Sequence, residues 1–153
     1  MHVHLRWFAA LAILPAALAA PAGATSAYVV QPDLEGDRIV FCAEGDLWLT
    51  SDQGGLSRRL TVHAGSESSP RFSPGGEWIA FTGEYDGGSD IYVMDIMGGV
   101  PRRLTYHPGA DRVIGWTPDG KSVLFRSRRH HRGQIGEERR YLRHKLFARP
   151  FWI

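Results

Sequence analysis

Short apolar runs separated by turns fill the chain after residue 28, and within them apolar and polar positions follow the two-residue period of strands. In Glu77–Thr82, Trp78 and Ala80 face one side while Ile79 and Phe81 face the other. After residue 24 no stretch has the period of an amphipathic helix. The pattern predicts an all-β fold.

The runs recur at one fixed spacing of 44 residues, which is the difference between Gly45 and Ser89. Self-similarity at about 40–45 residues is typical of β-propeller blades. The repeated segments are Gly45–Leu49 with Ser89–Val93, Gly54–Thr61 with Gly98–Thr105, and Phe72–Gly76 with Trp116–Gly120.

Each unit is predicted to form a four-stranded antiparallel blade. The first blade spans about 28–61, the second 69–105, and an incomplete third 113–126 contains only two strands. The predicted strands are 28–30, 37–43, 46–50 and 57–61; then 70–72, 77–82, 90–95 and 101–105; then 113–116 and 121–126. Propellers close with about four to eight blades, so two and a half blades predict the unclosed N-terminal part of a larger propeller.

The first 24 residues have the features of a secretory signal peptide. A short head carries Arg6, an apolar run covers Phe8–Ala20, and the small residues Ala22 and Ala24 suit the −3 and −1 cleavage positions. The run is shorter than the roughly 20 residues that a membrane-spanning helix needs. We therefore expect export to the periplasm or the extracellular space, with no membrane span after cleavage.

Export makes the cysteine content informative. The sequence contains one cysteine, Cys42, so no disulfide can form within the chain. Its place in the apolar run Ile39–Cys42 predicts a small buried hydrophobic side chain and not a reactive thiol.

The net charge of +2 conceals a division. Residues 126–150 contain nine Lys or Arg and two Glu, whereas the rest of the chain is mildly acidic. A basic tail over 129–153 can bind nucleic acid or anionic membranes. The alternative, which we favour because the repeat stops there, is that the tail is not propeller sequence, owing to truncation or a shifted reading frame. No nucleic-acid partner is expected.

Several phrases together resemble the repeat shared by TolB-like proteins and tricorn proteases. They are Phe72–Phe81, then Ser89–Met94, and then Gly98–Thr105. The similarity is closer to the bacterial tricorn-like proteases, through Gly36–Trp48, Gly83–Gly87 and Arg103–Gly120, and it covers about residues 28–128.

This resemblance implies a six-bladed N-terminal propeller that filters or channels peptide substrates. It also implies an oligomeric parent protein whose second propeller, PDZ-like domain and serine peptidase domain carry the chemistry. No residue of this chain matches the catalytic positions, so we expect no catalytic residue, metal or cofactor here. The alternative function is a TolB-like periplasmic module for protein–protein interaction, which would need an additional N-terminal domain.

Other candidate chemistry is weak. No Gly-x-Ser-x-Gly motif is present. His63 lies near Ser66, Ser68 and Ser69, but His63 and His107 occupy the same repeat position, which indicates loop residues. The loop Asp86–Asp90 lacks the ligand pattern of a calcium site. His130 and His131 lack further zinc ligands at the required spacing.

The recurring aromatic residues Trp48, Trp78, Tyr92 and Trp116 are predicted to pack between blades. Two arginine pairs also recur. If one member of each pair projects into a channel, the repeats present a positive ring suited to peptide carboxylates. The alternative is a solvated edge strand. The candidate channel contacts are Arg58, Arg59, Arg102 and Arg103.

Overall fold

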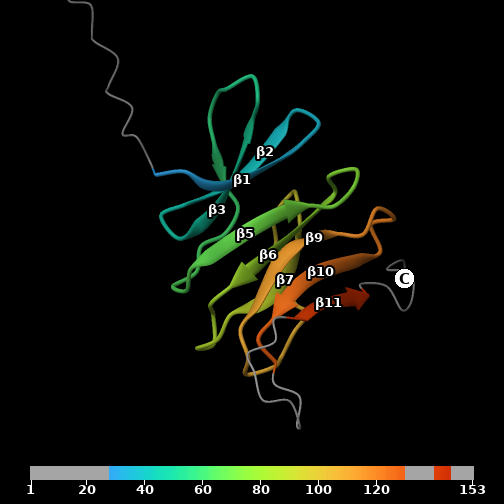
Figure 1. Cartoon of the computed structure of the whole chain (residues 1–153). Coiled ribbons are helices and arrows are strands. Elements are labelled where there is room, and N and C mark those ends of the chain that lie inside the picture. The colour runs from blue at the N-terminus through green and yellow to red at the C-terminus, as the bar shows by residue number, and fades with distance from the viewer. Residues whose placement is uncertain (1–27, 130–139, 146–153) are drawn as a thin grey trace, which may run out of the picture.

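The computed structural model describes residues 28–129 and 140–145, and within them every regular element is a β-strand. The strands form three antiparallel sheets, two with four strands and one with three (Figure 1). The first sheet contains β1 (Val30–Glu35), β2 (Arg38–Ala43), β3 (Asp46–Ser51) and β4 (Arg58–Arg59). The second contains β5 (Glu67–Phe72), β6 (Trp78–Gly83), β7 (Asp90–Asp95) and β8 (Arg102–Arg103). The third contains β9 (Asp111–Trp116), β10 (Ser122–Ser127) and β11 (Arg140–Lys145).

Each sheet is a meander, because its strands pair in the order of the sequence. The turn after the first strand shows why the repeat folds this way. The Ser73 hydroxyl accepts the backbone N–H of Trp78 at 3.0 Å, and one repeat later the Thr117 hydroxyl accepts that of Ser122 at 3.1 Å. Gly120 closes the second turn with a positive φ of 66°, which glycine adopts without steric cost. The predicted turns are confirmed.

The sheets stack face to face and bury two apolar clusters. The first lies between the first and second sheets and includes Val40, Leu47, Ile79, Phe81 and Tyr92. The second lies between the second and third sheets; it includes Ala80, Ile91, Val93, Val123 and Phe125. Because alternate residues of β6 enter different clusters, the middle sheet is buried on both faces.

The first strands of the three sheets, β1, β5 and β9, lie next to one another, and we call them the inner strands (Figure 1). The last strands, β4 and β8, lie at the opposite edges of their sheets. Both β1 and β5 contain a bulge at a residue with φ of 54°, Gln31 and Ser69, each followed by proline. A bulge leaves that position outside the ladder, so the missing N–H of proline costs no hydrogen bond.

The bulges explain two errors in the predicted boundaries. The first strand was expected at 28–30 and the fifth at 70–72, but β1 begins at Val30 and continues past Pro32, and β5 begins at Glu67. Proline ends most central strands, whereas at a bulge the strand continues through it.

The third sheet has one more strand than the repeat predicts. The segment assigned to the non-repeat tail contributes β11, whose Arg140 pairs with Ser127 and whose Lys145 pairs with Ser122. In the second sheet the equivalent of Ser127 is Gly83, one repeat earlier, and Gly83 pairs with Asp90. Arg140 therefore takes the place in the third sheet that Asp90 has in the second. The longer connection from β10 displaces β11 from the 44-residue spacing, and its sequence no longer resembles the earlier repeats. Three of the four strands of a blade are therefore present.

The fold class is confirmed: an all-β, unclosed array of about two and a half propeller blades. Cys42 is 2% exposed, as expected for a small core residue. The predicted signal peptide, His130 and His131, and most of the basic tail lie outside the described residues. Within the described ranges, none of the regular structure is a helix with the length and apolarity that crossing a membrane requires.

Candidate functional site: a basic cavity on the inner strands

The inner strands line a cavity of about 490 Å³ that is rich in arginine. Its walls come from all three sheets: Gln31 from β1, Ser69 and Arg71 from β5, Arg112, Val113 and Ile114 from β9, and Arg126 from β10. These residues lie on and beside the bulges. We call this space the inner cavity.

Two of its arginines are held in place by neighbouring inner strands. The Arg71 Nε donates to the carbonyl of Ile114 at 3.3 Å, and its Nη1 donates to the carbonyl of Pro70 at 2.7 Å. The Arg112 Nε donates to the Ser69 hydroxyl at 2.8 Å. These contacts use Nε of Arg112 and both Nε and Nη1 of Arg71, so Arg112 keeps both terminal nitrogens and Arg71 keeps Nη2 available for a ligand.

Arg126 has a different environment. In the part of the chain that the structure describes, its guanidinium has no hydrogen-bond or ion-pair partner. Arg126 occupies the register position that Cys42 has in the first sheet and Thr82 has in the second. Each of the three pairs with the second residue of the next strand: Leu47 of β3, Ile91 of β7 and Tyr141 of β11. A long cation therefore replaces a small buried side chain.

The charge on the inner cavity is unbalanced. Its lining residues include three guanidinium groups and no carboxylate. Outside the lining, the Asp33 Oδ1 lies 4.0 Å from the Arg71 Nη1. Guanidinium forks bind carboxylates and phosphates through paired, charge-assisted hydrogen bonds. This arrangement is suited to binding an anion.

A second polar cavity of about 400 Å³ adjoins the first and shares Arg112 and Arg126 with it. It adds Arg128, several hydroxyl groups and two acids, Glu84 and Asp111. Asp111 is fully buried and accepts a hydrogen bond from the Arg129 Nη2 at 2.7 Å, so its charge is compensated within the protein. The second cavity therefore carries charges of both signs, with Arg112, Arg126 and Arg128 beside Glu84, and is less one-sided than the inner cavity.

The comparisons with known proteins agree with this architecture. Residues 26–141, well over half of the chain, match the family described as the tricorn protease N-terminal beta propeller domain. The chain belongs to this family.

Among the relatives, a tricorn protease homolog of Streptomyces coelicolor is 50% identical over 56 residues, which is 36% of this chain and 5% of that protein. The crystal structure of the tricorn protease is 28% identical with a TM-score of 0.59, covering 65% of this chain and 11% of that one. TolB from Acinetobacter baumannii is 24% identical with a TM-score of 0.67, covering 80% of this chain and 31% of that one, and this likeness shows the fold alone. The chain thus spans a small part of its relatives.

The arginine pairs predicted as channel contacts lie on β4 and β8, the outermost strands of their sheets. Arg58 donates to the carbonyls of Ile96 and Met97 at 2.7 and 3.1 Å and thereby links the first sheet to the second. Arg59 forms an ion pair with Asp46. Arg102 is exposed. Whether any of them contacts peptide stays a prediction.

Arg103 shows the structural role of the second member of each pair. It donates to Asp90 at 2.6 Å and to Asp86 at 2.8 Å, and the buried Asp90 also accepts the Thr105 hydroxyl at 2.9 Å. The loop containing Asp86 and Asp90, considered above for calcium, thus directs two carboxylates at an arginine. Arg59 and Asp46 repeat the ion pair in the first sheet.

The histidine prediction is confirmed. The His63 Nδ1 accepts the N–H of Gly65 at 2.9 Å, and the His107 Nδ1 accepts that of Gly109 at the same distance. Both rings therefore stabilise the linker between two sheets. Ser66 and Ser69 bond to Glu84 and Arg112 and not to a histidine.

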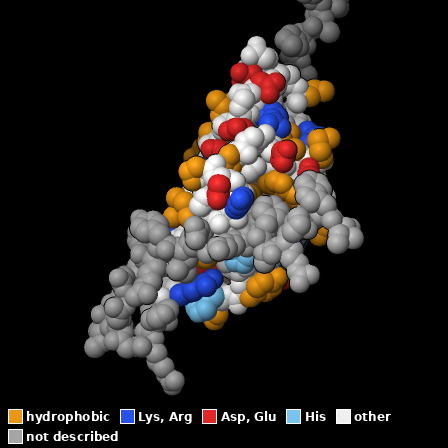
Figure 2. Space-filling model, turned by 90° about the vertical axis from the view of Figure 1, so that its right-hand side faces the viewer, with side chains coloured by type: hydrophobic (Ala, Val, Ile, Leu, Met, Phe, Trp, Pro, Cys, Tyr) orange, Lys and Arg blue, Asp and Glu red, His pale blue; other side chains and the backbone are white. Residues whose placement is uncertain are grey.

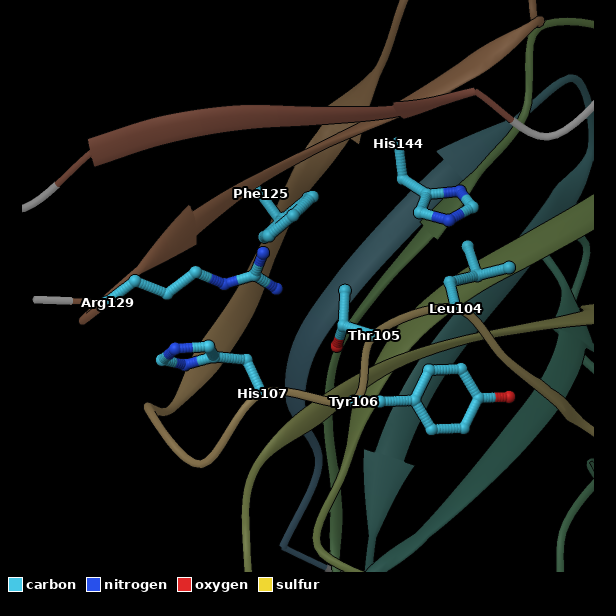
Figure 3. Close-up of a pocket in the computed structure, with 7 residues that line it drawn as sticks. All are labelled: Leu104, Thr105, Tyr106, His107, Phe125, Arg129 and His144. Carbon is cyan, nitrogen blue, oxygen red and sulfur yellow. The ribbon is translucent and has the colours of Figure 1, made fainter. Parts of the chain in front are cut away.

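A further cavity of about 420 Å³ lies where the linker after β8 meets β10 and β11 (Figure 3). Figure 3 shows the Arg129 guanidinium beside the Phe125 ring, 5.5 Å from its centroid, with His107 on the other side. Since Arg129 already binds Asp111 and the Thr105 hydroxyl bonds to Asp90, this cavity is largely a packing junction.

Arg71, Arg112 and Arg126 were not predicted as site residues from the sequence. They do not recur at the 44-residue spacing, whereas the outer pairs do, so the repeat drew attention to the outer edge. One available signal was position: Arg71 and Arg112 lie in the first strand of their units, which is the inner strand of a propeller blade.

Proposed function

We propose that this chain is exported and forms the start of the substrate-handling propeller of a tricorn-type serine protease. Its ligands would be peptides, which the inner strands receive, and peptide hydrolysis would belong to other domains of the parent protein. The observation that carries the proposal is the inner cavity: three sheets of the tricorn propeller family place Arg71, Arg112 and Arg126 around one space on the inner strands.

Two further features support a handling role over a catalytic one. His63, Ser66, Ser69 and His107 each have a structural partner, as with His63 and Gly65. No cluster of metal-binding side chains occurs among the residues that the structure describes. The arginine-lined inner cavity is a recognition surface, which suits guidance of a substrate toward chemistry performed elsewhere.

Peptide binding tests the handling role. The 153-residue chain is titrated into fluorescein-labelled peptides of mixed composition, and anisotropy is compared with that of a labelled folded protein of similar charge. We expect saturable binding of the unfolded peptides and little binding of the folded protein. Equal binding of both, or binding of neither, would contradict the proposal.

Export is tested separately. Residues 1–24 are fused to a phosphatase that is active only outside the cytoplasm. In the control fusion, Leu11→Arg and Leu18→Arg interrupt the apolar run. Activity of the first fusion and its loss in the second are expected. An inactive first fusion would remove the export part of the proposal and leave peptide handling unaffected.

A further inference from the structure

We propose that the inner cavity selects acidic peptides, binding an aspartate or glutamate side chain between Arg112 and Arg126 with Arg71 as a third donor. The inference rests on the proposed function and adds to it the class of peptide that is preferred. It follows from the geometry, the charge and the unusual placement of Arg126.

The geometry leaves donor atoms available on the cavity side. Contacts to the backbone of Pro70 and Ile114 and to the Ser69 hydroxyl fix the stems of Arg71 and Arg112. Holding these stems lowers the side-chain entropy that binding would otherwise cost. The terminal nitrogens of Arg112 and the Nη2 of Arg71 remain to bind a carboxylate.

The charge favours an anionic over a neutral or basic ligand. Arg59, Arg103 and Arg129 each have a carboxylate within 3 Å, at Asp46, Asp90 and Asp111. The three arginines of the inner cavity have nothing comparable, since Asp33 lies 4.0 Å from Arg71. Glu84 and Asp111 line the adjoining cavity, but no carboxylate is among the residues that line the inner cavity itself. A ligand carboxylate bound there would complete the pairing seen elsewhere in the molecule.

The placement of Arg126 gives an independent argument. At this register position the Thr82 hydroxyl accepts the N–H of Val113 and joins the second sheet to the third. Cys42, at the same position in the first sheet, is buried. Arg126 is only half-buried and lines both polar cavities. The third sheet has thus exchanged a packing residue for a cation at the wall that a peptide would contact.

A carboxylate side chain fits this site better than a basic or apolar one. The remaining lining residues are the amide of Gln31, the hydroxyl of Ser69 and the apolar Val113 and Ile114. The amide and hydroxyl can bond to a peptide backbone, and the apolar pair can contact the methylene groups of glutamate. A phosphate group is also an anion that guanidinium groups bind, so the experiment below compares a carboxylate with phosphate.

The test uses the full 153-residue chain and two labelled decapeptides of one sequence, the first with Asp and Glu and the second with Asn and Gln at those places. We expect at least about tenfold tighter binding of the acidic peptide, as charge-assisted bonds contribute roughly twice as much as neutral ones. The double variant Arg112→Gln with Arg126→Gln should remove this preference. Lys121→Gln, in the exposed turn between β9 and β10, removes one positive charge outside both polar cavities and should retain the preference, whereas the single variant Arg126→Gln, which also removes one charge, should weaken it.

The possible results separate the two proposals. Equal affinity for both peptides would overturn the acidic preference and leave peptide handling intact. Binding of neither peptide would overturn both. An equal loss of preference in Lys121→Gln and Arg126→Gln would also overturn the site, because general surface charge would then explain the preference.

Two measurements complete the test. Displacement of the acidic peptide by free glutarate, but not by inorganic phosphate at the same concentration, supports a carboxylate site, and the reverse order overturns it. Circular dichroism and the urea midpoint are recorded for every variant. If the double variant unfolds, the single variant Arg126→Gln, whose side chain holds no described contact, must reduce the preference or the proposal fails.

Discussion

Positions 67 and 111 are one repeat apart and both bury a carboxylate where two sheets meet, yet the two junctions stabilise it differently. Glu67 accepts hydrogen bonds from the hydroxyls of Thr61 and Tyr85, each at 2.6 Å. The Asp111 carboxylate instead accepts a hydrogen bond from the guanidinium of Arg129. Burial, above all, raises the pKa of Glu67, while the two hydroxyl bonds lower it in part.

The apolar parts of the junctions also differ. In the first, aromatic rings surround Phe81: its centroid lies 5.7 Å from that of Tyr92, which lies 4.6 Å from that of Tyr85. In the second, the equivalent Phe125 lies among aliphatic side chains and beside Arg129. The backbone repeat therefore fixes where the sheets meet, while each junction has its own means of stabilising the contact.

The largest expected effect tests the apolar difference. Phe81→Ala should lower the free energy of unfolding by about 3–5 kcal/mol, since a fully buried ring is replaced by a cavity. Phe125→Ala, at the equivalent place, should cost less because it has fewer aromatic neighbours. Urea unfolding followed by tryptophan fluorescence measures both. A larger loss for Phe125→Ala would reverse the comparison.

The next effect tests the ion pair of the second junction. Arg129→Ala should cost about 3 kcal/mol, because it leaves the buried Asp111 carboxylate uncompensated. Arg102→Ala, on the exposed edge strand, serves as the control and should change the urea midpoint very little. If the double variant Asp111→Asn with Arg129→Ala is no more stable than Arg129→Ala, the uncompensated charge is not the cause.

A smaller effect tests what the junctions share. Ser73→Ala and Thr117→Val each remove a hydroxyl that accepts a backbone N–H in the turn after an inner strand. Each should cost about 1 kcal/mol. Thermal unfolding of both variants measures the loss, and clearly unequal losses would show that the two turns are not energetically equivalent.

The smallest effect concerns pH. Since the pKa of Glu67 is higher in the folded than in the unfolded chain, protonation of Glu67 favours folding. Its favourable contribution is complete below the unfolded pKa and is lost as pH rises through the raised folded pKa. The stability of the wild-type chain relative to Glu67→Gln should therefore fall as pH rises from about 4 towards 7. Urea midpoints at matched pH give this difference, and a difference that rises with pH would reject the assignment.

Much of the fold follows from the sequence because the repeat combines two local signals. The alternation in Trp78–Thr82 sets which residues enter each core, and turns such as Ser73–Gly76 set where strands reverse. Both signals are local in sequence. Strand β11 was missed since its position depends on pairing with β10 and not on any repeated phrase.

The candidate site was harder to predict. Arg58, Arg59, Arg102 and Arg103 repeat, and the contacts of Arg58, Arg59 and Arg103 within the protein show that repetition here reflects a shared structural task. The inner cavity combines single residues from four strands, β1, β5, β9 and β10, without a common spacing. Only their convergence in three dimensions makes them a site. Figure 2 shows acidic, basic and apolar side chains together on the face that it presents.

Cys42 makes the opening of the first junction measurable by thiol labelling. The sequence has a single thiol, and burial, followed by the charge of Glu67, raises its pKa to about 12. A thiol reagent can therefore modify the protein only while the first and second sheets are apart, and the labelling rate counts those openings. Because nothing else in the chain competes for the reagent, the time between separations of neighbouring sheets can be measured without adding a probe.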